Sequence, residues 1–148
     1  MHRILYLAQA EVLHVIRDRA TLAQVLTALG TQLMREISDP TVVAVFRLAI
    51  AEAIQAPEVA RTLDSIGRET SRAALRHIMS ESRAAGLIEG RPADLAAQFF
   101  GFLWRDLMIS LLLGVAERPN PRAIEARARD AAEAVSPSTS DALRAALI

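Results

Sequence analysis

One stretch of the sequence, from Pro92 to Val115, is apolar around nearly its whole helical circumference. A helix without a wide polar face must be covered on most sides, by its own domain, by a second subunit or by lipid. Arg105 and Asp106 stand in the middle of this stretch, and each charge at a bilayer centre would cost about 2.5–3.5 kcal/mol. We therefore expect no membrane span, but a central helix with one face on its own core and another on a partner.

Composition favours an all-α fold of one domain. The 148 residues are 52% hydrophobic but only 4% aromatic, and alanine, the strongest helix former, supplies much of the apolar content. The formal net charge is zero, which gives no overall electrostatic signature for nucleic acid. The absence of cysteine excludes disulfides, thiolate catalysis and cysteine-ligated zinc. The apolar run after Arg3 has only about five residues, too short for a signal peptide, so we expect a cytoplasmic protein.

Helix-start signals divide the N-terminal half. A first helix is expected over His2–Arg19, and Thr21 with Gln24 forms a capping-box pattern that starts a second. Asp39 followed by Pro40 predicts the N-cap and first position of a third helix, Pro40–Gln55. That third helix is apolar on most faces and is therefore expected to be largely buried.

Glycine and proline organise the second half. A long segment from Pro57 to near Ala85 is expected to end at Gly86 as its C-cap glycine, and Gly67 divides it. The central helix follows, and Asn120 predicts the N-cap of a last helix, Pro121–Val135. We expect residues 1–135 to form the helical domain and residues 136–148 a linker and short tail.

Few residues suggest chemistry. Glu11 and His14 match half of a carboxylate-bridged di-iron site, whose second Glu-x-x-His helix is missing; a solvated i,i+3 pair is the simpler interpretation. We therefore predict no metal, no cofactor and no enzyme, with a di-iron helical enzyme as a distant alternative. The arginines of the Pro57–Ala85 segment form a stripe, interpreted as a solvated face rather than a phosphate-binding surface: Arg61, Arg68, Arg72, Arg76 and Arg83.

Arg105 and Asp106 have two possible roles. A charge within a buried helix is costly unless it is paired or reaches water. Either the two side chains make intramolecular ion pairs, with Glu52 and His77 as candidate counterparts, or lie exposed at one edge of the helix. Alternatively, they provide a polar fixing point inside an apolar ligand cavity.

Several local sequences stand out by their order and spacing: Val45–Ala53 (VFRLAIAEA), Pro57–Arg61 (PEVAR), Ala84–Ile88 (AAGLI), Pro92–Gly101 (PADLAAQFFG) and Leu111–Gly114 (LLLG). Together they resemble the C-terminal domain of TetR/AcrR-type transcriptional regulators, particularly the AefR-like subgroup. The match covers about Thr21 to Val135.

The resemblance implies an orthogonal or antiparallel helical bundle that senses a small apolar or amphipathic effector in a cavity between its helices. It also implies a homodimer, in which the helices corresponding to Pro92–Leu113 and Pro121–Val135 pair with those of a second subunit. Candidate ligand-binding residues are Phe46, Ile50, Met79, Leu103, Trp104, Met108 and Arg105. Candidate interface residues are Phe99, Phe100, Leu107, Leu111, Ile124, Ala128 and Ala131.

Such regulators carry a helix-turn-helix of about fifty residues ahead of this domain. Only some twenty residues precede Thr21 here, and none resembles a recognition helix, so we expect no DNA binding by this chain alone. We therefore expect either a fragment of a longer regulator or a sensor protein that lacks the DNA-binding domain. The alternative function is a stand-alone helical protein-interaction module, whose apolar surface serves another protein.

Overall fold

The computed structural model describes residues 16–136 and 147–148, and its regular structure there is entirely helical, which confirms the all-α prediction. The elements are α3 (Arg19–Ile37), α4 (Pro40–Ala51), α5 (Pro57–Leu63), the π-helical turn η1 (Asp64–Arg68), α6 (Glu69–Ala84), α7 (Pro92–Trp104), α8 (Leu107–Leu112) and α9 (Pro121–Val135).

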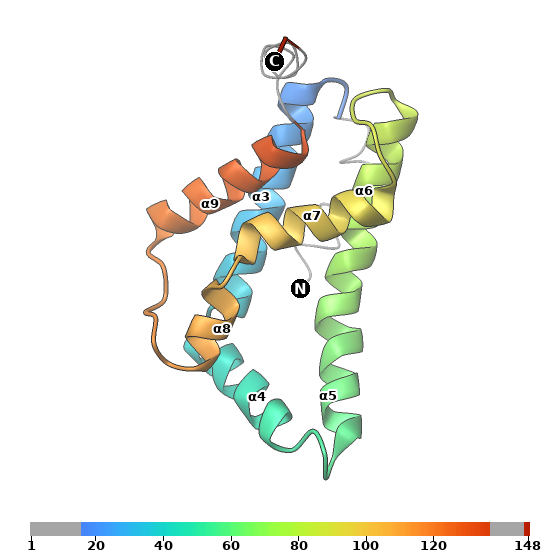
Figure 1. Ribbon diagram of the computed structural model, residues 1–148. Helices are drawn as coiled ribbons and strands as arrows, with labels where there is room; N and C mark the ends of the chain where they lie inside the picture. Colours follow the sequence, from blue (N-terminus) through green and yellow to red (C-terminus); the bar gives the residue numbers. More distant parts are fainter. Residues whose placement is uncertain (1–15, 137–146) are drawn as a thin grey trace.

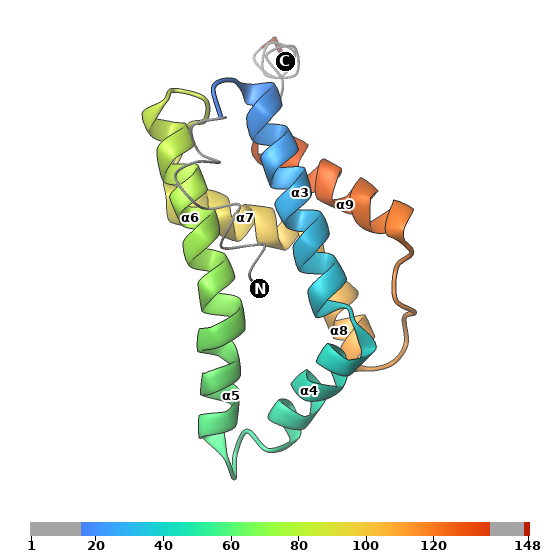
Figure 2. The same ribbon diagram turned by 180° about the vertical axis from the view of Figure 1, so that it is seen from behind.

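The helices form a frame rather than a parallel bundle. Figures 1 and 2 show α3 and the long α5–α6 rod as two sides of the frame, with α4 joining them at one end. Helix α7 crosses between these sides, and α9 packs along α3 and against α7. This crossing arrangement places α7 at the centre, as expected for the most apolar segment.

Helix α3 provides the main apolar stripe of the core. Its Leu22, Leu26, Leu29 and Leu33 are fully buried at the three- and four-residue spacing that places side chains on one helix face. Against them α9 contributes mainly alanines, which allow the two helices to approach closely. At Gly30 an added Cβ would lie 3.1 Å from both Ala128 Cβ and Phe99 Cζ, so any side chain here would crowd the closely packed helices.

The helix caps confirm some boundaries and correct others. Asp39 accepts a hydrogen bond from Thr41 N–H, with Pro40 at the first helical position, as predicted. Asn120 likewise caps α9 through Ala123 N–H. The expected capping box at Thr21 is wrong: Asp18 is the N-cap and accepts from both the Thr21 N–H and its hydroxyl. Residues 16–18 are consequently not helical, and the rest of the predicted first helix lies outside the described residues.

Gly86 ends α6 as predicted. Its φ is +75°, a conformation that glycine adopts without a Cβ clash. Leu87 N–H donates to Ser82 C=O and Gly86 N–H to Arg83 C=O, the paired bonds of a Schellman motif. The division expected at Gly67 is also present, since the π-helical turn Asp64–Arg68 lies between α5 and α6 and is marked by the i to i−5 bond from Glu69 N–H to Asp64 C=O.

The central helix is broken where it was expected to be continuous. Helix α7 ends at Trp104 and α8 begins at Leu107, while Arg105 adopts φ 47° and ψ −126°. A non-glycine residue in this region costs on the order of 1–3 kcal/mol. The break turns both Arg105 and Asp106 outward, where they are exposed. No ion pair joins either residue to Glu52 or His77 among the described residues, so the exposed alternative is the observed one.

Three arginines bind the carboxyl-terminal carbonyls of neighbouring helices. Arg127 of α9 donates to Leu103 and Trp104 C=O at 3.1 and 3.0 Å, at the end of α7. Arg47 of α4 donates to Leu112 and Leu111 C=O at 2.8 and 2.7 Å. Arg118 donates to the Arg35 C=O near the end of α3. A cation at this end of a helix satisfies unpaired carbonyls and interacts favourably with the helix dipole.

The prediction that the third helix is largely buried is wrong for α4. It ends at Ala51 rather than Gln55, and within it only Val43 and Ala49 are buried. Within the helix, the side chains of Leu48 and Ile50 are 58% and 60% exposed to solvent. Ile54, beyond the helix end, is 96% exposed. Apolar residues on most faces therefore did not mean burial on most faces. None of the helices in the described part of the chain has the length and apolarity to cross a membrane.

Candidate ligand-binding site

A pocket of about 450 Å³ lies between α4, the α5–α6 rod, α7 and α8. This volume is within the range of roughly 300–1,000 Å³ typical of small-molecule sites. The lining residues are Ile37, Phe46, Ala49, Ile50, Ala53, Ala60, Leu63, Asp64, Arg68, Ser71, Arg72, Phe100, Trp104, Met108 and Leu112.

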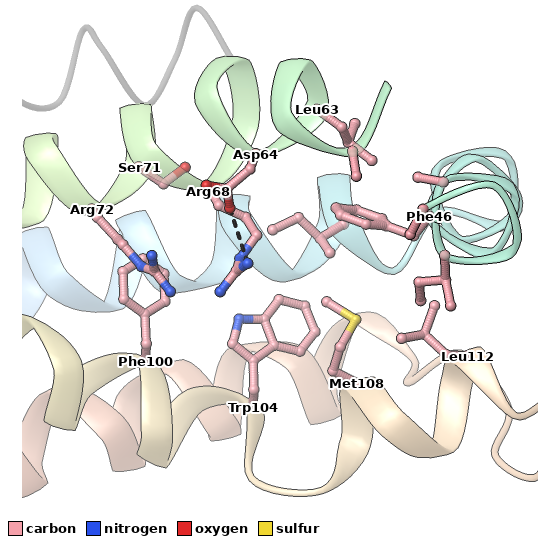
Figure 3. Close-up of a pocket in the computed structure, with 15 residues that line it drawn as sticks. Phe46, Leu63, Asp64, Arg68, Ser71, Arg72, Phe100, Trp104, Met108 and Leu112 are labelled. Carbon is pink, nitrogen blue, oxygen red and sulfur yellow. Dashed lines mark hydrogen bonds and ion pairs between the residues drawn. The ribbon is translucent and has the colours of Figure 1, made fainter. Parts of the chain in front are cut away.

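The two ends of the pocket differ in chemistry. At one end Phe46, Met108 and Leu112 face one another from α4 and α8 (Figure 3). At the other end Arg68 and Arg72 extend from the rod toward α7, where Trp104 and Phe100 lie (Figure 3). The site is thus an apolar chamber with charged groups gathered on one side.

The π-helical turn helps to place those charged groups. Each residue added to a helical turn rotates the following side chains by about 100° around the helix axis. The π-helical turn η1 therefore changes which residues of α6 face the pocket, relative to a continuous α-helix. Its polar backbone is satisfied locally: the Ser71 hydroxyl donates to Gly67 C=O at 3.0 Å. Short π-helical segments are often found at functional sites.

Four of the predicted ligand-binding residues line this pocket: Phe46, Ile50, Trp104 and Met108. Met79 and Leu103 do not, because both are fully buried in the core between helices. Arg105 is outside the lining as well, since the break after α7 turns it to solvent. Whether the four residues contact an effector remains a prediction.

Sequence reasoning missed the polar end. Arg68 and Arg72 had been interpreted as part of a solvated face, and Phe100 as an interface residue, yet all three line the pocket. Their spacing alone could not reveal this, because α5–α6 presents different faces before and after the π-helical turn. Leu63 and Ser71 on the same rod were not selected for the same reason.

Most of the predicted interface residues are buried by contacts within their own protomer. Phe99, Ala128 and Ala131 are fully buried, and Leu107, Leu111 and Ile124 are nearly so. In this conformation they offer little surface to a second copy, and their role in an interface stays a prediction. Phe100, the remaining one, packs against the core at the pocket edge.

The candidate metal-ligating residues fall mostly outside the described part of the chain. Glu11 and His14, the possible half-motif for iron, and His2 lie outside the described residues. Within the described residues no group of three or more His, Asp or Glu side chains is positioned to hold a metal ion.

The crossing-helix frame is also found in a solved structure. The structure of a protein named as a TetR-family transcriptional regulator from Mesorhizobium loti superposes with a TM-score of 0.70 at 24% sequence identity, covering 89% of this chain and 61% of that chain. At this identity the likeness shows the fold. No curated protein gives a significant sequence match.

The family is shown by sequence. Residues 24–136 match the family described as AefR-like transcriptional repressor, C-terminal domain. The chain therefore belongs to this family, and the predicted resemblance is confirmed. It spans 61% of the length of the Mesorhizobium regulator.

Proposed function

We propose that this chain is the effector-sensing and dimerisation domain of a TetR-like regulator, and that its effector is a small apolar or amphipathic molecule. The observation that carries this proposal is the 450 Å³ pocket, which is lined mainly by apolar side chains and has a few polar groups at one end. That combination is typical of small-molecule sites. The domain would act without catalysis, in the cytoplasm.

Helix α4 is the wall best suited to respond to an effector. It buries only two of its own residues, and Arg47 ties it to the last turn of α8. An occupant packed between Phe46 and Met108 would add contacts that hold α4 against α8. A ligand that binds one arrangement of these helices more tightly shifts the population toward it. Operator binding would belong to a DNA-binding head, not to the described residues.

The single tryptophan makes the effector proposal testable. Trp104 lines the pocket and is nearly buried, so its fluorescence should change when an apolar compound enters. A ligand that binds only the folded state also raises the melting temperature. We expect both signals from at least some members of a panel of small hydrophobic compounds, and Phe46→Asp should abolish both without unfolding the domain, because Phe46 is only half-buried.

The dimer proposal uses the exposed faces of α7 and α9. Gly101 and Phe102 of α7 are exposed, and a Cβ added at Gly101 meets no atom within 4 Å. Gly101→Arg should therefore leave the protomer folded but push a second copy away. We expect a homodimer of the unmodified chain and a monomer of this variant in analytical ultracentrifugation at micromolar concentration. Ala73→Arg, on the exposed face of α6, is the control and should remain dimeric.

A second candidate function rests on a different observation. Leu48, Ile109 and Leu113, on or just after α4 and α8, are each more than half exposed. An exposed apolar surface of this kind often marks a protein interface, which would suit a stand-alone interaction module. If no compound perturbs Trp104 and a defined protein copurifies with the chain, the module is the better account.

A further inference from the structure

Among the described residues, the charged end of the pocket contains one arginine without a paired carboxylate. Arg68 Nη1 lies 2.9 Å from Asp64 Oδ1, so these two side chains neutralise each other. Arg72, one turn further along the rod, makes no ion pair and no side-chain hydrogen bond within the described part of the chain, although it is half-buried and lines the pocket. The described lining residues at this end therefore carry one net positive charge.

The other arginines of the same stripe behave differently. Arg76 pairs with Glu69 at 2.9 Å and lies outside the pocket lining. Arg83 is exposed near the end of α6 and also lies outside the lining. Among the arginines of this stripe, Arg72 is the one that both lines the apolar cavity and makes no ion pair with the described residues. A half-buried guanidinium beside apolar side chains loses part of its hydration, and a hydrogen-bonding anion is the strongest replacement for it.

We propose that the effector is an amphiphile with a monoanionic carboxylate head, which Arg72 binds while the apolar body extends past Trp104 toward Met108 and Leu112. This inference rests on the proposed effector-binding function of the same pocket. The planar guanidinium fork matches a carboxylate with two parallel N–H···O bonds. One uncompensated positive charge matches a monoanion, and the Asp64 carboxylate, already paired with Arg68, adds no net repulsion.

Three ligands with the same ten-carbon chain test the head group: decanoate, 1-decanol and decyltrimethylammonium. Each is titrated into the chain below its critical micelle concentration, and Trp104 fluorescence reports binding. We expect decanoate to bind roughly tenfold more tightly than 1-decanol, the effect of about 1.4 kcal/mol from one charge-assisted contact. The cation should bind more weakly than the alcohol.

Two variants test whether Arg72 is responsible for tighter binding of decanoate than of 1-decanol. Arg72→Gln should weaken decanoate by roughly tenfold, to the affinity of 1-decanol, and leave 1-decanol unchanged. Arg83→Gln removes the same charge from the same helix outside the pocket and should leave both affinities as they are. Unchanged helical circular dichroism and melting would show that Arg72→Gln is folded.

The outcomes separate the two proposals. If decanoate and 1-decanol bind equally, or if Arg72→Gln weakens both to the same degree, the carboxylate inference is overturned while the effector pocket stands. If Arg83→Gln has the same effect as Arg72→Gln, the preference comes from net charge and the assignment to Arg72 is wrong. If none of the three compounds binds while another compound of the hydrophobic panel does, the head-group inference is overturned and the effector pocket stands. If no compound of the panel binds either, the effector pocket is refuted as well.

Discussion

The two ends of this helical frame contain similarly apolar helices but bury their side chains to different extents. The packed half comprises α3, α7 and α9, and the pocket half comprises α4, α5, η1 and α8. In the packed half, the leucines of α3 are fully buried. In the pocket half, α4 has at least as apolar a sequence, yet it leaves Leu48 and Ile50 more than half exposed. Apolar content therefore measures what a helix can bury, and packing partners determine what it does bury.

The comparison has a physical consequence for stability and motion. Regions with few buried apolar contacts open at lower free-energy cost than the core. The packed half should therefore supply most of the unfolding free energy, whereas the pocket half keeps a cavity and a loosely covered wall. This division would suit the proposed sensor function, since the part that would respond to a ligand is not the part that holds the fold together.

The largest expected difference between the halves comes from matched truncations. Leu26→Ala in α3 should reduce the unfolding free energy by about 2–5 kcal/mol, because it leaves a cavity in a dense core. Ile50→Ala in α4 should cost less than about 1 kcal/mol, because that side chain is 60% exposed. Urea denaturation of both variants measures the two costs. Equal losses would show that the pocket wall is as well packed as the core.

The next largest effect on stability is expected from adding a side chain at a crowded glycine. Gly30→Val should destabilise the domain by about 1–3 kcal/mol, because its Cβ meets Ala128 and Phe99 at 3.1 Å. Gly101→Val on α7 is the control, since a Cβ there meets no atom within 4 Å. Thermal unfolding should separate the two variants, and a Gly30→Val protein as stable as the unmodified chain would contradict the close α3–α9 packing.

Arg127 of α9 binds the carboxyl-terminal end of α7, within the packed half. Arg127→Met removes both hydrogen bonds to the Leu103 and Trp104 carbonyls and should cost about 1–2 kcal/mol. Arg129→Met breaks only an exposed pair with Glu125 and should cost about 0.5 kcal/mol or less. Denaturant titration gives both values. If the two variants lose the same amount, the break between α7 and α8 does not depend on Arg127.

The smallest effect is expected at the start of α3. Hydrogen bonds from the Thr21 backbone and then from its hydroxyl lower the pKa of Asp18 from its ordinary value of 3.8. Because the folded-state pKa is lowered, the contribution to stability is present above about pH 4 and is lost as the pH falls through the folded-state pKa. Asp18→Ala should lower the melting temperature slightly at pH 6, and the difference should narrow toward pH 3. A constant difference across this range would contradict the cap.

Much of the helix layout could be predicted from local residues. Asp39–Pro40, Gly86 and Asn120 act through their own backbone and nearby N–H groups, so their roles are visible in the sequence. The start of α3 was misplaced by three residues because Asp18 and Thr21 are both good caps, and nothing local decides between them. The family assignment followed from the same ordered local patterns.

The break at Arg105 and the lining of the pocket were not predictable in the same way. Local propensity favours one continuous helix from Pro92 onward. The end of α7 is visible only in the structure, where Arg105 has a φ of 47° and Arg127 binds the freed carbonyls. Likewise, the inward position of Arg72 depends on the π-helical turn before it and on α7 opposite. Helical periodicity identifies a face, but not what that face meets.

The sequence by itself determined that this chain is all-α, where most of its helices begin and end, and which family it belongs to, because propensities and caps act over a few residues. Tertiary structure decided which apolar faces are buried, where the central helix breaks and which side chains line the pocket. Those outcomes depend on contacts between segments far apart in the chain, such as α3 with α9 and α4 with α8, whose geometry no local pattern encodes.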